Sequence, residues 1–364
     1  FIVRNCYVHD GWNNGKYGIY LDPVINGIID NNIVENNGTG IYLEYSDNNI
    51  ISNNIVRKNL YNGIRLDYSD NNLVENNIAE NNGDDGIELG ESENNLILNN
   101  VAKTNSWNGI VLWNSNNNNI SNNLVGNNYH GIHFAYDSYN NIIENNTVEN
   151  NEYGIYLAEV GHGSDNNLIS NNFVENNSNG IRLIGSSNNT IENNTCYNNS
   201  PGIYLDRSDN NLISSNVVEN GYNPSIELEY SNNNLLFNNT MENNHGDGIR
   251  LHYSDNNFLS NNTLKNNFYD GIDISGSNNI VSNNIMENNT NGIRLNGSSN
   301  LLSNNVCSNN NNYGIRLMGL NNTLDNNLCS NNFLFGIFLE SSSSNNTLTN
   351  NIVENNALGI QLYS

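Results

Sequence analysis

Tyrosine, arginine, histidine and acidic residues recur at position x of a Gly-Ile-x-Leu segment that is found throughout this chain. Five of the eight arginines occupy that position. Aromatic rings offer flat apolar faces to sugar rings, and a guanidinium pairs with a carboxylate through two parallel hydrogen bonds. These residue types therefore favour a carbohydrate-binding face. Trp113 is added because it lies two residues after position x of its own segment. The candidate binding residues are Tyr20, Tyr42, Arg65, Trp113, His133, Tyr156, Arg182, Tyr204, Arg250, Arg294 and Arg316.

Three of these residues form the best candidate for catalysis. His133, Tyr156 and Arg182 occupy position x in three successive segments. A base, a phenol and a guanidinium suit β-elimination or epimerisation at a uronate, because they can move a proton and stabilise developing negative charge. The alternative is that arginines and acids on this face only pair across neighbouring strands. We favour this alternative of cross-strand pairing, in which the protein is not an enzyme.

The Gly-Ile-x-Leu segment belongs to a longer repeat. Sixteen anchor positions, which are glycines except for Ser225, lie 21 to 26 residues apart from Gly18 to Gly359. Within each repeat, apolar residues alternate in short pairs such as Ile64 and Leu66, which is the periodicity of a strand and not of a helix. Three short strands in every 22–23 residues predict a parallel β-helix of about 16 coils.

The same repeat predicts which side chains form the core. Ile51, Val56, Ile64 and Leu66 should point inward and stack on their equivalents in neighbouring coils. One coil has too few apolar residues to fold alone, so stability should come from stacking. Asparagines at the corners, such as Asn54, should bond to the backbone and stack as amide ladders.

Composition excludes several classes of partner. The 364 residues include 99 asparagines, only 12 lysines and arginines, and 37 acidic residues, which gives a net charge of −25. Nucleic acids and anionic membranes require clusters of cations, so neither is an expected partner. No apolar run reaches 18 residues, and no membrane insertion is expected.

The repeat length and consensus, shown by one copy with Ile51, Asn54, Val56, Gly63 and Leu66, resemble the NosD/CASH group of β-helix proteins. The resemblance implies an all-β fold, a single-stranded right-handed parallel β-helix with three short strands per coil. It covers residues 1–364, which we expect to form one repeat domain. The group includes carbohydrate-binding proteins, sugar hydrolases and many microbial surface proteins.

The uniform repeat favours one function within that group. No coil departs far from the consensus to build a pocket, which is typical of an extracellular structural or adhesive protein of a microbial cell surface. The alternatives are a carbohydrate-binding module and a polysaccharide lyase or C5-epimerase that acts on uronate-containing glycans. Uronate epimerases of this fold are expected to carry a Tyr-Gly-x-Asp-Pro-His motif. Residues Tyr17–Pro23 contain Tyr-Gly and Asp-Pro at a different spacing and lack the histidine.

No cofactor or metal is expected. The resemblance raises copper binding, but copper favours clustered Cys, Met or His, and these are scattered here. Cys196, Cys307 and Cys329 occupy a core position of the repeat. Ser-Asp-Asn turns such as Ser46–Asn48 offer oxygen ligands to Ca²⁺, although turn hydrogen bonds are the favoured role.

Thirteen Asn-x-Ser/Thr sequons permit glycosylation in an extracellular setting. They begin at Asn37, Asn119, Asn145, Asn176, Asn188, Asn193, Asn198, Asn238, Asn261, Asn288, Asn296, Asn321 and Asn345.

The sequence shows no capping segment at either end of the repeats. Two interpretations remain open: residues 1–364 are a fragment of a longer array, or subunits stack end to end and continue the β-helix as a filament. The expected partners are therefore other copies of the chain or other surface proteins, and polysaccharide.

Overall fold

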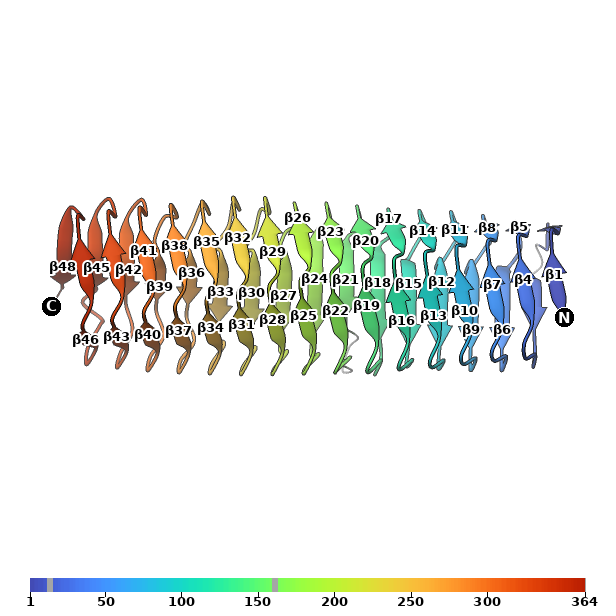
Figure 1. The fold of residues 1–364 in the computed structure, drawn as a ribbon, viewed down its shortest axis with the longest axis horizontal. Helices are drawn as coiled ribbons and strands as arrows, with labels where there is room; N and C mark the ends of the chain where they lie inside the picture. Colours follow the sequence, from blue (N-terminus) through green and yellow to red (C-terminus); the bar gives the residue numbers. More distant parts are fainter. Residues whose placement is uncertain (12–15, 159–162, 364) are drawn as a thin grey trace. The chain divides into compact units, whose positions relative to one another are not determined.

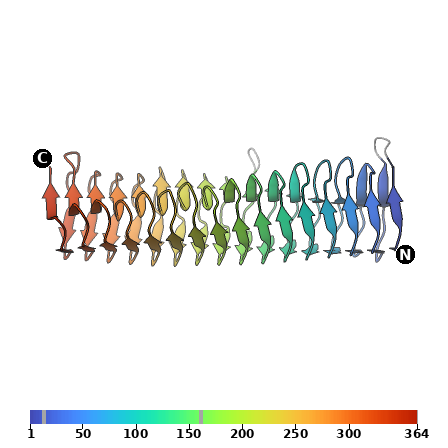
Figure 2. The same cartoon turned by 90° about the horizontal axis from the view of Figure 1, so that it is seen from above.

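The computed structural model describes residues 1–11, 16–158 and 163–363. These residues form 48 β-strands and no α-helix, so the described chain contains no helix that could cross a membrane. The chain divides into two compact units, residues 1–190 and residues 191–364. Within each unit three parallel sheets, here named A, B and C, each take one strand from every coil (Figures 1 and 2).

Residues 1–190 form eight coils. Sheet A contains β1 (Ile2–Arg4), β4 (Ile28–Asp30), β7 (Ile50–Ser52), β10 (Leu73–Glu75), β13 (Leu96–Leu98), β16 (Asn119–Ser121), β19 (Ile142–Glu144) and β22 (Leu168–Ser170). Sheet B contains β2 (Tyr7–His9), β5 (Ile33–Glu35), β8 (Ile55–Arg57), β11 (Ile78–Glu80), β14 (Val101–Lys103), β17 (Leu124–Gly126), β20 (Thr147–Glu149) and β23 (Phe173–Glu175). Sheet C contains β3 (Tyr17–Leu21), β6 (Thr39–Glu44), β9 (Ile64–Asp67), β12 (Ile87–Gly90), β15 (Asn108–Trp113), β18 (His130–Ala135), β21 (Tyr153–Leu157) and β24 (Asn179–Ile184).

Residues 191–364 repeat this arrangement, and β25 (Thr190–Glu192) contains the division between the units. Sheet A continues with β28 (Leu212–Ser214), β31 (Leu235–Phe237), β34 (Phe258–Ser260), β37 (Ile280–Ser282), β40 (Leu301–Ser303), β43 (Thr323–Asp325) and β46 (Thr347–Thr349). Sheet B contains β26 (Thr195–Tyr197), β29 (Val217–Glu219), β32 (Thr240–Glu242), β35 (Thr263–Lys265), β38 (Ile285–Glu287), β41 (Val306–Ser308), β44 (Leu328–Ser330) and β47 (Ile352–Glu354). Sheet C contains β27 (Ile203–Asp206), β30 (Ile226–Glu229), β33 (Ile249–His252), β36 (Ile272–Ile274), β39 (Ile293–Leu295), β42 (Tyr313–Leu317), β45 (Phe335–Leu339) and β48 (Leu358–Leu362).

The predicted fold class is confirmed: the protein is all-β, with three short strands in each coil and parallel pairing between coils. In sheet C, Ile64 pairs with Ile87 and Leu66 pairs with Leu89. Equivalent residues of successive repeats therefore lie beside each other. The prediction that residues 1–364 form one domain stays a prediction.

The predicted core is also confirmed. Ile51, Val56, Ile64 and Leu66 are completely buried. Along β9 the burial alternates, so that Arg65, between Ile64 and Leu66, is half-exposed. Burying each aliphatic side chain contributes roughly 1.5–3 kcal/mol. The cysteines at positions 196, 307 and 329 lie in the same core, and Cys307 pairs in register with Cys329.

Asparagine has two distinct roles in this fold. Buried asparagines form ladders: the amide of Asn77 accepts from the backbone nitrogen of Asn54 at 2.9 Å and donates to the Ile51 carbonyl oxygen at 2.8 Å and to Asn100 Oδ1 at 3.1 Å. Exposed asparagines adopt the left-handed conformation, as Asn76 does at a φ of 56°. Asn tolerates that conformation better than other residues with a side chain.

We expect Asn77→Ala to destabilise the protein by about 2–4 kcal/mol. The substitution leaves the buried Asn54 backbone nitrogen without its acceptor, at a cost of about 1–3 kcal/mol, and it also removes the bonds that Asn77 makes with Asn54 Nδ2, the Ile51 carbonyl oxygen and Asn100 Oδ1. Chemical unfolding measures the change. The neighbouring control Asn76→Gly should change stability by only a few tenths of a kcal/mol, because glycine accepts a positive φ. Equal effects of the two substitutions would contradict the ladder's role.

Candidate functional site

Position x forms a continuous outward column on sheet C, as the sequence predicts. In residues 1–190 the register runs through Tyr20, Tyr42, Arg65, Glu88, Val111, His133, Tyr156 and Arg182. In residues 191–364 it runs through Tyr204, Glu227, Arg250, Asp273, Arg294, Arg316, Phe338 and Gln361. The strands thus place side chains from successive coils next to one another.

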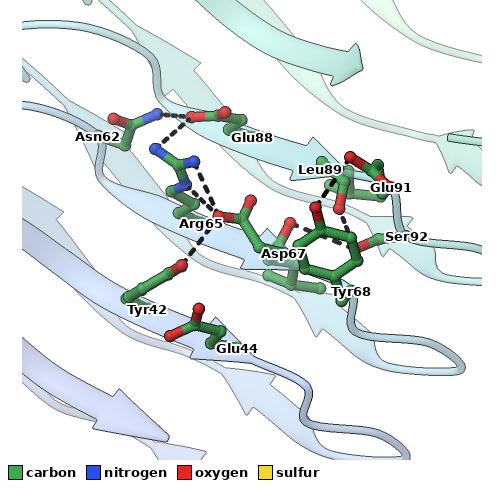
Figure 3. A network of polar contacts seen from close by, with 12 residues as sticks. Tyr42, Glu44, Asn62, Arg65, Asp67, Tyr68, Glu88, Leu89, Glu91 and Ser92 are labelled. Atoms are coloured by element: carbon green, nitrogen blue, oxygen red, sulfur yellow. Dashed lines mark hydrogen bonds and ion pairs between the residues drawn. The ribbon is translucent and has the colours of Figure 1, made fainter. Parts of the chain in front are cut away.

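Arg65 is the centre of a polar network on β6, β9 and β12 (Figure 3). Its guanidinium bonds to Asp67 Oδ2 at 2.8–2.9 Å and lies 3.8 Å from Glu88 Oε2. Tyr42 donates to the same Asp67 oxygen at 2.9 Å, and Asn62 donates to Glu88. The Arg65 guanidinium also lies over the Tyr42 ring, at 5.5 Å from its centroid. Arg65 is therefore held rigidly between two carboxyl groups.

Asp85 and Glu88 form an unusual pair of carboxyl groups. Burial, and then the charge of Asp84, raise the pKa of Asp85 to about 7. Burial raises the pKa of Glu88 to about 7 as well, since its 3.8 Å contact with Arg65 is too long to offset desolvation. Asn62 Nδ2 donates to both carboxyls, which places them close together. Near neutral pH this pair can hold or release protons.

Three cavities over sheet C share Arg65. One of about 510 Å³ is lined by Arg65, Asp67, Tyr68, Glu88, Gly90, Glu91, Trp113, Asn114, Tyr136 and Asp137. A second of about 320 Å³ is lined by Arg65, Asp84, Asp85, Glu88, Trp107, Asn108, Trp113, His130 and His133. A third of about 260 Å³ is lined by Tyr17, Thr39, Tyr61, Asn62, Arg65 and Asp84. The three cavities that share Arg65 are named together the sheet C groove.

One acceptor at the groove has no partner among the described residues. Asp67 Oδ1 is buried and accepts no hydrogen bond. It lies against Gly90, where an added Cβ would stand only 2.7 Å from it. The absence of a side chain at position 90 leaves this part of the groove open beside the carboxyl group.

The structure brings the three predicted catalytic residues together in register. The histidine among them, His133, is already held by a hydrogen bond and by ring stacking. The His133 and Tyr156 rings stack with centroids 5.1 Å apart, and the Arg182 guanidinium lies over the Tyr153 ring at 5.3 Å. His133 is buried, and its Nε2 donates to the Ala158 carbonyl oxygen at 3.0 Å. This arrangement packs His133 into the wall of the groove. Its catalytic role stays a prediction.

A second histidine, His130, lies beside it. Its Nδ1 bonds to Asn108 Oδ1 at 2.7 Å, and Asn108 Nδ2 in turn donates to Asp85 Oδ1 at 2.7 Å. Burial, and then the neighbouring His133, lower the pKa of His130 to about 3. His130 is therefore neutral at physiological pH and connects the histidines to the carboxyl pair through Asn108.

Other candidate binding residues make cross-strand pairs. Tyr20 donates to Glu44 at 2.5 Å, and Tyr204 donates to Glu229 at 2.6 Å. Arg316 Nε donates to Glu340 at 2.7 Å. These contacts are the ladder pairs that the alternative interpretation anticipates. The Tyr20 ring also stacks on Tyr17 at 4.8 Å and on Tyr42 at 5.3 Å.

The turns and sequons are placed as follows. The Asp70 backbone nitrogen donates to Asp47 Oδ1 at 2.7 Å, so this Ser-Asp-Asn turn makes a hydrogen bond to the next coil. No group of three or more His, Cys, Asp or Glu side chains in the described ranges is placed to hold a metal ion. Asn37 is buried and donates to the Glu35 carbonyl oxygen, whereas most other sequon asparagines are exposed or half-exposed.

Sequence reasoning missed Asp84, Asp85, Asn108 and His130. A signal for them exists. The residue before the anchor is Asn in both flanking coils, at Asn62 and Asn108, but it is Asp85 in a coil that also has an acid, Glu88, at position x. Two acids in one coil, three residues apart, mark the carboxyl pair.

Two family models match the chain. The model described as "Right handed beta helix region" matches residues 134–257 and 236–364, which together cover more than half of the chain. The model described as "Periplasmic copper-binding protein (NosD)" matches residues 2–163. No curated protein matches this chain.

Solved structures with the same fold include several proteins of low sequence identity. The periplasmic alginate epimerase AlgG is 16% identical, with a TM-score of 0.53 over 94% of this chain and 79% of that chain. The Dettilon tailspike protein gp208 is 13% identical, with a TM-score of 0.55 over 92% of this chain and 62% of that one. The Agl-KA catalytic domain is 15% identical, with a TM-score of 0.50 over 92% and 62%. At these identities the likeness concerns the fold alone.

Proposed function

The chain belongs to the right-handed β-helix family, and from this premise we propose that it is a carbohydrate-binding protein that holds a glycan in the sheet C groove. The sheet C groove is the observation that carries the proposal. It combines the faces of Trp113, Tyr68 and Tyr136 with the fixed polar groups of Arg65 and Glu88. Flat apolar faces flanked by a few rigid polar groups suit a sugar ring.

The charge of the groove indicates the class of glycan. Among the described residues, six carboxyl groups line it, from Asp67, Asp84, Asp85, Glu88, Glu91 and Asp137, against the single guanidinium of Arg65. Like charges repel at this range. We therefore infer that the groove takes uncharged or amino sugars. The same repulsion weighs against uronate elimination or epimerisation there.

The comparisons support a carbohydrate ligand and a location outside the cytoplasm. An alginate epimerase shares the fold, and its description places that protein in the periplasm, as does the description of the NosD model. We infer an extracytoplasmic location for this chain, with the cell surface as the finer proposal. The structural or adhesive role and end-to-end assembly stay separate predictions, which electron microscopy at several protein concentrations tests.

We expect Trp113→Ala to weaken binding of a neutral oligosaccharide about tenfold, because a ring contact contributes roughly 1–1.5 kcal/mol. Isothermal titration calorimetry with gluco-, xylo- and chito-oligosaccharides measures the change. Phe333→Ala is the matched control, since this exposed ring lines none of the three cavities of the groove. Wild-type protein that binds none of these sugars, or equal affinities of Trp113→Ala and wild type, would contradict the proposal.

A further inference from the structure

Residues 191–364 repeat the carboxyl pair of the groove within their own coils. Asp270 and Asp273 occupy, around Gly271, the positions that Asp85 and Glu88 occupy around Gly86. Asn291 Nδ2 donates to Asp270 Oδ1 at 2.6 Å, as Asn108 donates to Asp85. Burial raises the pKa of Asp270 to about 7 and also raises that of Asp273. The two arrangements therefore share one local design.

The coils that follow the two pairs carry different residues at position x. Glu88 pairs in register with Val111, whereas Asp273 pairs with Arg294. The second arrangement thus gains a guanidinium directly beside the carboxyl group. With Arg294 in place of a valine, the second arrangement presents a positive charge to a ligand.

Arg294 has unused hydrogen-bonding capacity. Its closest ion pair is a long one, 3.6 Å from NH1 to Asp273 Oδ2. Its Nε is buried and donates no hydrogen bond within the described part of the chain. A buried donor without an acceptor is costly. The Arg294 side chain is 41% exposed, so an incoming anion can reach its terminal guanidinium nitrogens.

The neighbouring arginines are engaged. Arg250 donates to Asp247 at 2.7 and 3.0 Å and lies 3.5 Å from Glu227. Arg316, the register neighbour of Arg294, bonds to Glu340 at 2.7 Å. Arg294 is accordingly the guanidinium of this column that is best placed to receive an anion.

A cavity opens beside it. Its volume is about 260 Å³, and it is lined by Arg250, Leu251, His252, Asp273, Ser275, Arg294 and Asn296. This is below the roughly 300–1,000 Å³ of sites for drug-sized ligands, so it suits a single sugar residue. Tyr253 stacks on Tyr230 at 5.3 Å and lies 4.2 Å from the His252 ring. An exposed aromatic platform therefore borders the cavity.

We propose that residues 191–364 contain a second saccharide site, at which Arg294 binds the carboxylate of a uronic acid residue. The proposal rests on the proposed carbohydrate-binding function but assigns a different ligand to a different place. The planar guanidinium presents parallel donors that match a carboxylate, and Ser275 and Asn296 supply uncharged polar groups for hydroxyls. A sulfated sugar offers similar oxygens, so the test separates the two anions.

Protonation should strengthen this site. Asp273 lines the cavity with Arg250, His252 and Arg294, and the charges of Asp247 and Arg294 act on both Asp270 and Asp273. Because burial raises the pKa of Asp270 to about 7, lowering the pH from 8 to 6 removes negative charge near Arg294, and burial shifts the pKa of Asp273 in the same direction. Uronate binding should therefore tighten as the pH falls from 8 to 6.

The test is isothermal titration calorimetry of the full chain with three ligands: short oligoguluronate, a sulfated oligosaccharide and a neutral gluco-oligosaccharide. We expect Arg294→Gln to weaken uronate binding tenfold or more and to leave neutral binding unchanged. Arg316→Gln, the matched control one coil away, should bind uronate like wild type. Trp113→Ala should keep uronate binding, which separates this site from the groove.

Three results would overturn the proposal: no uronate binding by wild type, equal binding by Arg294→Gln, or equal losses in Arg294→Gln and Arg316→Gln. Preference for the sulfated sugar would reject the carboxylate assignment. If Arg294→Gln does not fold, amide shifts of His252 and Asn296 in wild-type protein on adding oligoguluronate decide instead. If the protein binds uronate through Arg294 but binds no neutral oligosaccharide, the proposed function of the sheet C groove is refuted and the second site is supported.

Discussion

Asp85→Asn is expected to stabilise this protein at pH 8 and to remove a large part of the pH dependence of its unfolding between about pH 4 and pH 7. The physical cause is the burial of the Asp85 carboxyl, which raises its pKa to about 7. The side chain must release its proton inside the fold when the pH rises. An asparagine cannot ionise, so that cost disappears.

The direction follows from proton linkage. A folded-state pKa above the unfolded value means that the folded protein holds more protons between the two values, so stability falls as the pH rises through that window. A difference of this size corresponds to on the order of 4 kcal/mol at pH 8. Glu88 adds to the same dependence, since burial raises its pKa to about 7 too. The charge of Asp84 raises the pKa of both carboxyl groups, and the charge of Arg65 lowers it.

The fold retains the shorter contact of this side chain after the substitution and loses only the 3.4 Å bond that Asp85 Oδ2 accepts from Asn62. Asn62 and Asn108 occupy the same repeat position in the flanking coils, and asparagine retains the oxygen that accepts from Asn108 at 2.7 Å. Unfolding by denaturant at pH 5, 6, 7 and 8 measures the effect. Asp209→Asn is the matched control, because Asn232 stands at that repeat position in the next coil. An Asp85→Asn curve parallel to wild type across this range would show that Asp85 ionises freely in the fold.

Gly86→Ala is expected to destabilise the protein by about 3 kcal/mol or more. An alanine Cβ at this position would stand 2.5 Å from the Gly109 carbonyl oxygen and 2.8 Å from Asn105 Nδ2. Both are buried atoms held in ladders, and overpacking at such a site forces the backbone to move. Thermal or chemical unfolding measures the loss.

Ser225 supplies the control for this prediction. It takes the anchor position in its own coil, where the bond from the Ile226 nitrogen to the Gly248 carbonyl oxygen is 3.1 Å, against 2.9 Å from Ile64 to Gly86. The coil has adjusted to a Cβ there. Ser225→Gly should therefore change stability by less than about 1 kcal/mol. A similar small effect of Gly86→Ala would mean that the coils separate easily, contrary to this interpretation.

The sequence alone determined the fold and the outward column. Each coil contacts its neighbours in the stack, so a repeat of constant length places equivalent residues such as Ile64 and Ile87 side by side. The alternation around Arg65 then decides which side chains face inward. For the same reason the register of His133, Tyr156 and Arg182 could be read directly from the spacing.

Only the tertiary structure decided which members of that column form a site. The spacing gives no indication that Asp85 and Glu88 are largely buried or that His133 donates to the Ala158 carbonyl oxygen. Nor does it indicate that Arg294 Nε has no partner among the residues that the structure describes. These properties depend on side chains from several successive coils and on how they exclude water. Repeat spacing fixes the position of each backbone segment, whereas burial and charge balance arise from the particular side chains that meet there.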